Sequence, residues 1–274
     1  MTQPHRTTAG PIILVGCGNM GGALLTGWLA RGIAPAAICV VDPDPGRREL
    51  LPEGVHWSAD AEALPATAEA IVLAVKPQLL AQVAPAYAGL AGRGALVLSI
   101  AAGRTLAALA ACVGERAAIV RAMPNTPAAI GRGISVAVAN PFVDAAQRRL
   151  ADELLAAAGE VAWVDDEALI DAVTAVSGSG PAYVFLLCEC LTEAGIDAGL
   201  PAHLAARLAR ATVAGAGELL HRADEPPAEL RRRVTSPGGT TEAALKVLMA
   251  DDGLAPLLAA AVRRAAARAR ELAG

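Results

Sequence analysis

Short runs of β-branched and apolar residues alternate with amphipathic stretches through the first 165 residues of the chain. Runs of this length and composition predict buried strands, and apolar positions three or four apart predict helices. The expected strands are 12–15, 38–41, 71–75, 95–100, 118–121, 134–139 and 161–164. The expected helices between them are 20–31, 78–87, 106–113 and 145–157. This alternation is typical of an α/β domain whose sheet is mostly parallel and doubly wound.

The strand and helix rhythm stops near residue 165, and helical periodicity alone continues to the end of the chain. Gly- and Pro-rich segments interrupt it at 178–181, 199–201, 225–227 and 236–239. We therefore expect an α/β domain over residues 1–165 and an all-helical domain over residues 166–274. The stretch 182–191 is apolar on every side except at Glu189, so it needs cover all round. A second copy of the chain is a reasonable source of that cover, which predicts a homodimer through the helical domain.

Composition and charge narrow the class of protein. The hydrophobic share of 54% includes 66 alanines, which favour helices and carry little apolar area. No run approaches the roughly 18 consecutive apolar residues of a membrane-spanning helix, and the polar start does not look like a signal peptide. Acidic residues number 27 against 23 basic ones, and this net charge of −4 argues against nucleic-acid binding. Five cysteines, thinly spread, predict no disulfide framework, so we expect a cytoplasmic protein.

The first expected strand leads into a glycine motif, Gly16-Cys17-Gly18-Asn19-Met20-Gly21, which opens the first expected helix. In this setting the first glycine allows a tight turn, the second admits a pyrophosphate, and the third lets helix and strand pack closely. The N–H groups at the helix N-terminus then face the phosphates. The motif therefore predicts a Rossmann-type dinucleotide site.

Asp42 ends the second expected strand, 21 residues after Gly21, where an acidic residue meets the adenosine ribose. Its carboxylate would bind a ribose 2′-hydroxyl and repel a 2′-phosphate, which favours NAD. Arg47 and Arg48 follow closely and could receive a 2′-phosphate, or could simply be two exposed helix residues. The sequence leaves the choice between NADP and NAD open.

Three further segments follow strands of the same expected sheet. They are Lys76-Pro77, Ser99-Ile100-Ala101-Ala102-Gly103 and Met123-Pro124-Asn125-Thr126-Pro127. Ligands of open parallel sheets bind at these strand ends, so Lys76 could approach a cofactor and the Asn125 amide could orient a nicotinamide. Each segment alone also fits an ordinary loop, but their common edge favours the cofactor.

In the helical half, two segments have loop chemistry suited to a site. Ser177-Gly178-Ser179-Gly180-Pro181-Ala182-Tyr183 breaks one expected helix and starts the next, and an ordinary helix–helix turn explains it equally well. Ser236-Pro237-Gly238-Gly239-Thr240-Thr241 precedes another helix, and its N–H groups and hydroxyls could hold a small anion such as a substrate carboxylate. No His, Cys, Asp or Glu cluster has metal-ligand spacing, so no metal site is expected.

Six segments, taken in order, resemble those of the pyrroline-5-carboxylate reductase family, and the resemblance extends from about Ile12 to the C-terminus. The segments are GCGNMG, AVKP, SIAAG, RAMPNTP, VSGSGPAY and SPGGTT. The resemblance implies a Rossmann-type domain followed by a helical domain that interlocks with a second subunit, in dimers that often assemble further. It implies hydride transfer from NAD(P)H to C5 of L-1-pyrroline-5-carboxylate, which gives L-proline in the last step of proline biosynthesis. Asp42 departs from the small hydroxyl residue of many members, so the usual NADPH preference does not carry over.

The resemblance also assigns site residues, motif by motif. The cofactor contacts it implies are the glycine motif from Gly16 to Gly21, with Ala74, Val75, Lys76, Pro77, Ala101, Ala102, Gly103 and Asn125. Asp42 is added to these by its spacing from the glycine motif and not by the resemblance. The substrate contacts are Glu167, Ser236, Gly238, Gly239, Thr240 and Thr241. Thr241 would be the catalytic residue, because it would hydrogen-bond the ring nitrogen while the proton comes from solvent or from an already protonated substrate.

Other classes of protein share parts of this pattern. A β-hydroxyacid dehydrogenase has the same two-domain plan, but that family places a catalytic lysine in the first long helix after the Rossmann domain, and Lys246 lies too late for that. A related imine reductase or a non-catalytic dinucleotide sensor that dimerises are further alternatives. A sensor needs no carboxylate pocket, so the SPGGTT segment weighs against it.

Overall fold

The computed structural model describes residues 10–273, and the chain divides into two compact units. One unit contains the chain as far as Gly178 together with the segment from Ala266 onward, and the other is Ser179–Ala265. This division lies later than residue 165, where the predicted strands end. The reason is that Ile170, only 1% exposed, still packs on Val136 and Val138 of the sheet.

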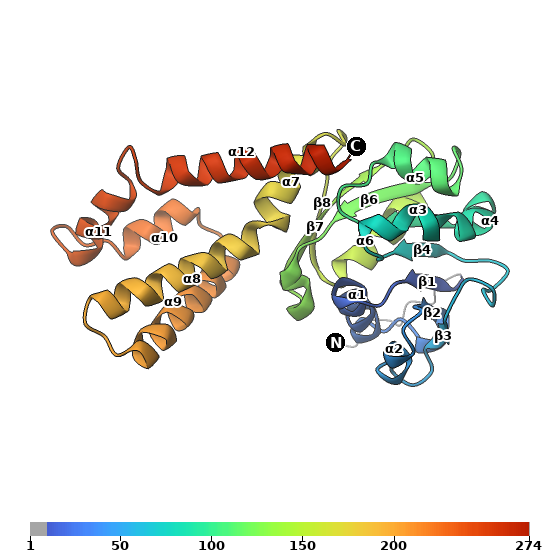
Figure 1. The fold of residues 1–274 in the computed structure, drawn as a ribbon, viewed down its shortest axis with the longest axis horizontal. Coiled ribbons are helices and arrows are strands. Elements are labelled where there is room, and N and C mark those ends of the chain that lie inside the picture. The colour runs from blue at the N-terminus through green and yellow to red at the C-terminus, as the bar shows by residue number, and fades with distance from the viewer. Residues whose placement is uncertain (1–9, 274) are drawn as a thin grey trace. The chain divides into compact units, whose positions relative to one another are not determined.

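The first unit is built on an eight-stranded sheet in the order β3-β2-β1-β4-β5-β6-β7-β8 (Figure 1). The strands are β1 (Ile12–Val15), β2 (Ile38–Val41), β3 (His56–Ser58), β4 (Ala70–Leu73), β5 (Leu96–Ser99), β6 (Ile119–Met123), β7 (Gly133–Ala139) and β8 (Gly159–Trp163). Only the β6–β7 pair is antiparallel among these strands. The predicted doubly wound, mostly parallel sheet is confirmed. The edge strand β3 was not predicted, because three residues with one apolar side chain are too short to show a period.

The helices of the first unit connect these strands. They are α1 (Asn19–Ala30), α2 (Pro45–Glu49), α3 (Leu80–Val83), α4 (Ala88–Gly92), α5 (Leu106–Val113), α6 (Ala145–Ala156) and α7 (Leu169–Val173), with 3-10 turns η1 (Pro35–Ala37), η2 (Pro77–Leu79), η3 (Ala84–Tyr87) and η4 (Thr126–Ile130) and a π-turn η5 (Thr174–Gly178). The single helix expected at 78–87 is instead the short α-helix α3 between the 3-10 turns η2 and η3. Pro85 contributes to this break, because proline has no N–H for a helical hydrogen bond.

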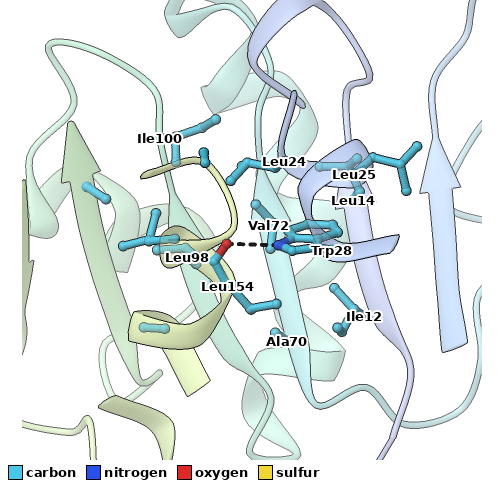
Figure 2. Close-up of a cluster of buried hydrophobic side chains, with 14 of the residues drawn as sticks. Ile12, Leu14, Leu24, Leu25, Trp28, Ala70, Val72, Leu98, Ile100 and Leu154 are labelled. Carbon is cyan, nitrogen blue, oxygen red and sulfur yellow. Dashed lines mark hydrogen bonds between the residues drawn. The ribbon is translucent and has the colours of Figure 1, made fainter. Parts of the chain in front are cut away.

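Helices cover both faces of the sheet, so alternate strand residues are buried in two separate clusters. Figure 2 shows the first cluster, in which Leu24 and Trp28 of α1 pack on Leu14 and Val72. The indole N–H of Trp28 donates a 2.8 Å hydrogen bond to the carbonyl of Leu154 in α6. This bond fixes α1, the helix that begins at the glycine motif, to a second helix on the same face.

The second unit is helical throughout. It contains α8 (Gly180–Asp197), α9 (Ala202–Arg222), α10 (Pro227–Arg233), α11 (Thr240–Leu248) and the first part of α12 (Leu254–Ala273). Across Ser179–Ala265, all of which the structure describes, only Ala205 and Ala209 are buried. In a single copy of the chain, large apolar side chains of this unit are exposed to solvent. Examples are Phe185, which is 63% exposed, and Leu257, which is 66% exposed.

Among the described residues, one helical stretch, which begins in the first unit and continues through α8, has the length and composition of a membrane span. Leu169–Asp197 runs through 29 residues, and an 18-residue part of it has a mean hydropathy of 1.3 with 11% of that part buried. A single stretch of this kind is weak support for a membrane protein, because the core helix of a soluble protein has the same length and composition. An apolar helix that is uncovered in one copy is also what a subunit interface requires.

Candidate functional site

The carboxyl ends of the central strands bring the predicted cofactor segments to one edge of the sheet. Val15 is level with Val41 on one side and with Leu73 on the other. The residues that come directly after these three strands are therefore neighbours, and the N–H of Ala74 donates to the carbonyl of Val15 at 2.8 Å. The structure thus places the glycine motif, Asp42 and the Ala74–Pro77 segment together, as the sequence predicts.

The glycine motif has the geometry that a dinucleotide needs. Gly16 has φ of +89°, and a Cβ atom there would lie 2.9 Å from the carbonyl oxygen of Ala74. A Cβ at Gly21 would lie 2.2 Å from the carbonyl oxygen of Gly16. A Cβ at Gly18, the N-cap of α1, would meet nothing within 4 Å, so the helix N-terminus is open to approach. These residues fit a pyrophosphate bound at the N-terminus of α1.

Asp42 fastens the glycine motif to the end of β2. Asp42 is buried, with 9% of the residue exposed, and its Oδ2 atom accepts the N–H of Cys17 at 2.7 Å. Oδ1 accepts the N–H of Asp44 at 3.0 Å. Burial raises the pKa of the Cys17 thiol, and the negative charge of Asp42 adds to this rise. The two hydrogen bonds from Cys17 and Asp44 hold the Asp42 carboxylate in place without any ligand.

The next two segments along the sheet edge are tied to each other. Arg104 donates from Nε to the carbonyl of Pro77 at 2.9 Å, while Lys76 is exposed. Gly103 has φ of +65°, and a Cβ there would lie 3.3 Å from the carbonyl oxygen of Leu272 in the C-terminal segment. Gly103 thus lies against the end of α12, a contact that sequence spacing cannot reveal.

Asn125 joins three segments of the first unit. Its Nδ2 donates to Ser177 Oγ at 3.2 Å, and its Oδ1 accepts the N–H of Ile134 at 2.9 Å. Close by, a Cβ at Gly178 would lie 2.6 Å from Met123 Cε. The RAMPNTP and VSGSGPAY segments therefore meet, although about fifty residues separate them along the chain.

Glu167 is bound to a buried cation. Its Oε1 accepts from Arg121 Nη1 at 2.6 Å and from the N–H of Leu106 at 2.7 Å. The Arg121 side chain is 4% exposed, whereas that of Glu167 is 29% exposed. Sequence reasoning did not single out Arg121, yet a signal was present, because an arginine inside the apolar strand β6 requires a buried partner.

The SPGGTT segment forms the N-terminus of α11, with Gly239 as the N-cap. Gly238 has φ of +69°, and its N–H donates to Glu242 Oε2 at 2.6 Å. The N–H of Gly239 donates to the carbonyl of Ser236 at 3.0 Å. A carboxylate bound at these two glycines would have to displace oxygen atoms of the chain itself. Helix geometry leaves the N–H groups of Thr240 and Thr241 without an intrahelical acceptor, so these donors suit an anion better.

Sequence reasoning also missed Glu242, which holds this segment in shape. Its position three residues after the N-cap is the signal that could have found it, because a glutamate there commonly reaches back to an N–H before the helix. Lys246, one turn later, places its Nζ atom 3.9 Å from Glu242 Oε1. Among residues 10–273, no group of three or more His, Cys, Asp or Glu could hold a metal ion.

Comparison with known protein families matches both parts of the chain. A family model described as pyrroline-5-carboxylate reductase dimerisation matches residues 167–272. A second, described as NADP oxidoreductase coenzyme F420-dependent, matches residues 11–103. The chain is 45% identical to the pyrroline-5-carboxylate reductase of Pseudomonas aeruginosa over 267 residues, which is 96% of this chain and 96% of that protein.

Solved structures agree with this match. A pyrroline-5-carboxylate reductase from Coxiella burnetii superposes with a TM-score of 0.92 at 37% identity, covering 97% of this chain and 100% of that one. A Plasmodium falciparum pyrroline carboxylate reductase with NADP bound superposes with a TM-score of 0.81 at 27% identity, covering 97% and 99% of the two chains.

Proposed function

The chain belongs to the pyrroline-5-carboxylate reductase family, and from this premise we propose that it reduces L-1-pyrroline-5-carboxylate to L-proline with NADPH or NADH, the last step of proline biosynthesis. One observation carries the proposal. The 45% identity to the Pseudomonas aeruginosa reductase extends over 96% of both chains, so it includes the dinucleotide segments and the SPGGTT segment together.

The chain's own residues supply a binding frame for the cofactor, which contributes the hydride when bound. Gly16 to Gly21 and the N-terminus of α1 would hold the pyrophosphate of the cofactor. Ala74 to Pro77 and Ala101 to Gly103 would make the remaining cofactor contacts. Asn125 stands near the nicotinamide. Its two hydrogen bonds, to Ser177 and to Ile134, support this role because they fix the amide in one orientation.

The residues that bind the substrate orient the imine, and none of them is needed as a strong acid to protonate it. Ser236, Gly238, Gly239 and Thr240 form the segment that holds the substrate carboxylate. The N–H groups of Thr240 and Thr241 bind it, because those of the two glycines already have acceptors within the chain. The Thr241 hydroxyl hydrogen-bonds the ring nitrogen. A protonated imine is already a good electrophile, so correct placement suffices and the proton comes from solvent or from the substrate itself. Glu167 stands near the substrate, and its bonds to Arg121 and Leu106 hold its carboxylate in place.

A homodimer through the helical domain completes the proposal, with further assembly of dimers as in other family members. The apolar side chains that one copy leaves exposed on α8 and α9 support this interface, as does the dimerisation model that spans residues 167–272. We propose a soluble cytoplasmic enzyme whose partners are its small-molecule substrate and its own second copy, with no nucleic acid and no membrane.

The test is the loss of near-ultraviolet absorbance of NADPH, and separately of NADH, when pyrroline-5-carboxylate is added to the purified protein, with proline identified as the product. Oxidation with proline formed is the expected result. A folded protein that binds either cofactor and oxidises neither would overturn the proposal in favour of a dinucleotide sensor or of a different imine substrate.

A further inference from the structure

We propose that Asp42 makes this chain select NADH over NADPH. This inference rests on the dinucleotide site of the proposed function, and it departs from the NADP named for the Plasmodium falciparum structure and for the family model at residues 11–103. It concerns the adenosine end of the cofactor only, so it does not depend on which imine is reduced.

The Asp42 carboxylate is already fixed where the adenosine ribose is expected. It follows β2 directly, it is 9% exposed, and its two oxygen atoms accept the N–H groups of Cys17 and Asp44 at 2.7 and 3.0 Å. A carboxylate has about four acceptor positions, so further hydrogen bonds from ribose hydroxyls can be added to these two. Because both oxygen atoms are tied to the backbone, the charge cannot swing away from an incoming ligand.

A 2′-phosphate would bring a charge of roughly −1.5 to −2 to this position. Repulsion between like charges is strong beside a partly buried carboxylate, because little water screens it there. The ribose 2′-hydroxyl of NADH has the opposite effect, since it can donate a hydrogen bond to the same oxygen atoms. The geometry of Asp42 therefore discriminates against the phosphate and in favour of the hydroxyl.

The two arginines that could offset this charge have other partners. Arg47 Nε lies 3.8 Å from Asp44 Oδ2, and the guanidinium of Arg48 lies 5.5 Å from the ring centroid of Trp57. Asp44 also accepts the N–H of Gly46 at 2.9 Å as the N-cap of α2, so a second carboxylate stays beside Arg47. A 2′-phosphate would thus meet the carboxylates of Asp42 and Asp44, while Arg47 is paired with Asp44 and Arg48 is stacked on Trp57.

Calorimetric titration of the intact protein with NADH and with NADPH, in the absence of any imine, tests this directly. We expect NADH to bind about tenfold or more tightly than NADPH at moderate ionic strength. Equal affinity, or tighter binding of NADPH, would overturn the proposal. Because no turnover is measured, a protein that prefers NADH but does not reduce pyrroline-5-carboxylate would leave this inference standing and remove only the proposed function.

Two variants locate the cause of the preference. Asp42→Asn keeps an oxygen atom for the N–H of Cys17 and removes the charge, so the ratio of the two dissociation constants should fall to within about threefold. Arg47→Ala is the matched control, and it should leave the ratio at its wild-type value. If Asp42→Asn retains the full ratio, Asp42 does not govern the choice. If Arg47→Ala weakens NADPH binding selectively, the arginine does contact the 2′-phosphate, and the stated pairing of Arg47 with Asp44 is overturned. Should Asp42→Asn fail to fold, the wild-type titration still decides, because equal affinity for the two cofactors would overturn the role of Asp42.

Discussion

The guanidinium of Arg121 lies 2.6 Å from the carboxylate of Glu167, and this pair joins the middle of the sheet to the N-terminus of a helix. Arg121 is in β6 and is almost fully buried, while Glu167 also accepts the N–H of Leu106 at the start of α5. Glu167 therefore has a structural task besides its proposed place near the substrate. A loss of activity in a Glu167 variant has to be separated from a loss of folding.

Glu167→Ala should lower the free energy of unfolding by about 3–5 kcal/mol, because it leaves Arg121 buried without a counter-charge. Glu167→Gln should cost much less, since the amide oxygen still accepts from Arg121 and Leu106. Urea unfolding followed by circular dichroism measures both. Glu229→Ala, which removes the exposed partner of Arg232, is the control and should change stability by less than about 1 kcal/mol. Equal effects of Glu167→Ala and Glu229→Ala would contradict a buried pair.

Thr241→Ala should lower kcat about tenfold or more, because the hydrogen bond at the ring nitrogen would be lost in the transition state. The dissociation constant of NADH should change little, since Thr241 belongs to the substrate segment. Steady-state kinetics and titration of the cofactor separate the two effects. Thr241→Ser keeps the hydroxyl and should recover most of the turnover. Unchanged turnover in Thr241→Ala would remove the proposed role.

Gly21→Ala and Gly22→Ala form a matched pair in the first turns of α1. A Cβ at position 21 would lie 2.2 Å from the carbonyl oxygen of Gly16, whereas a Cβ at position 22 would meet nothing within 4 Å. Gly22→Ala should stabilise the protein by up to about 1 kcal/mol, while Gly21→Ala should destabilise it and weaken dinucleotide binding. Thermal unfolding and cofactor titration measure the difference. The idea of a tight glycine turn fails if the two variants behave alike.

Stability should fall at alkaline pH because of Tyr87, which is 1% exposed. Burial raises the pKa of its phenol, and Cys39 and Asp60 add to the rise. The unfolded phenol ionises near its ordinary pKa of about 10, so the stabilisation is fully present below that pH. Above it, stability should decrease by about 1.4 kcal/mol for each pH unit while the folded phenol stays neutral.

The melting temperature from pH 8 to pH 11 measures this effect, and Tyr87→Phe should make the decline shallower by removing the ionising group. The decline should not vanish, because burial also raises the pKa of the Cys17 and Cys39 thiols. A decline of the same steepness in Tyr87→Phe would show that the phenol does not contribute.

Phe185→Glu should shift the protein from dimer toward monomer. Phe185 lies on α8 and is 63% exposed in one copy, so a partner must cover it if α8 is part of the interface. Sedimentation velocity over a range of protein concentrations measures the assembly. Leu50→Glu, at a residue that is 74% exposed in the first unit, is the control and should leave the dimer intact. A dimer that tolerates Phe185→Glu as well as Leu50→Glu would place the interface elsewhere.

The sequence by itself determined the architecture of the first unit, because its strands are short, continuous apolar runs and helices such as α5 and α6 begin at side-chain caps. The strand β1 and the helix α5 have the expected bounds, 12–15 and 106–113. The glycine motif could be placed at the cofactor edge for the same reason, since it directly follows β1 and opens α1. Family membership followed from six ordered segments, which are local features of the chain.

Only the tertiary structure decided which polar groups are already engaged. Three hydrogen-bonded pairs join residues that are far apart in the chain. They are Asp42 with Cys17, 25 residues apart, Glu167 with Arg121, 46 apart, and Asn125 with Ser177, 52 apart. No periodicity records such pairs, because hydrogen bonds between distant segments depend on sheet order and on strand register. The bond from Gly238 to Glu242 is different, because it is local and the position of Glu242 three residues after the N-cap is visible in the sequence. Sequence pattern determined where the segments lie, and close packing determined what each side chain touches.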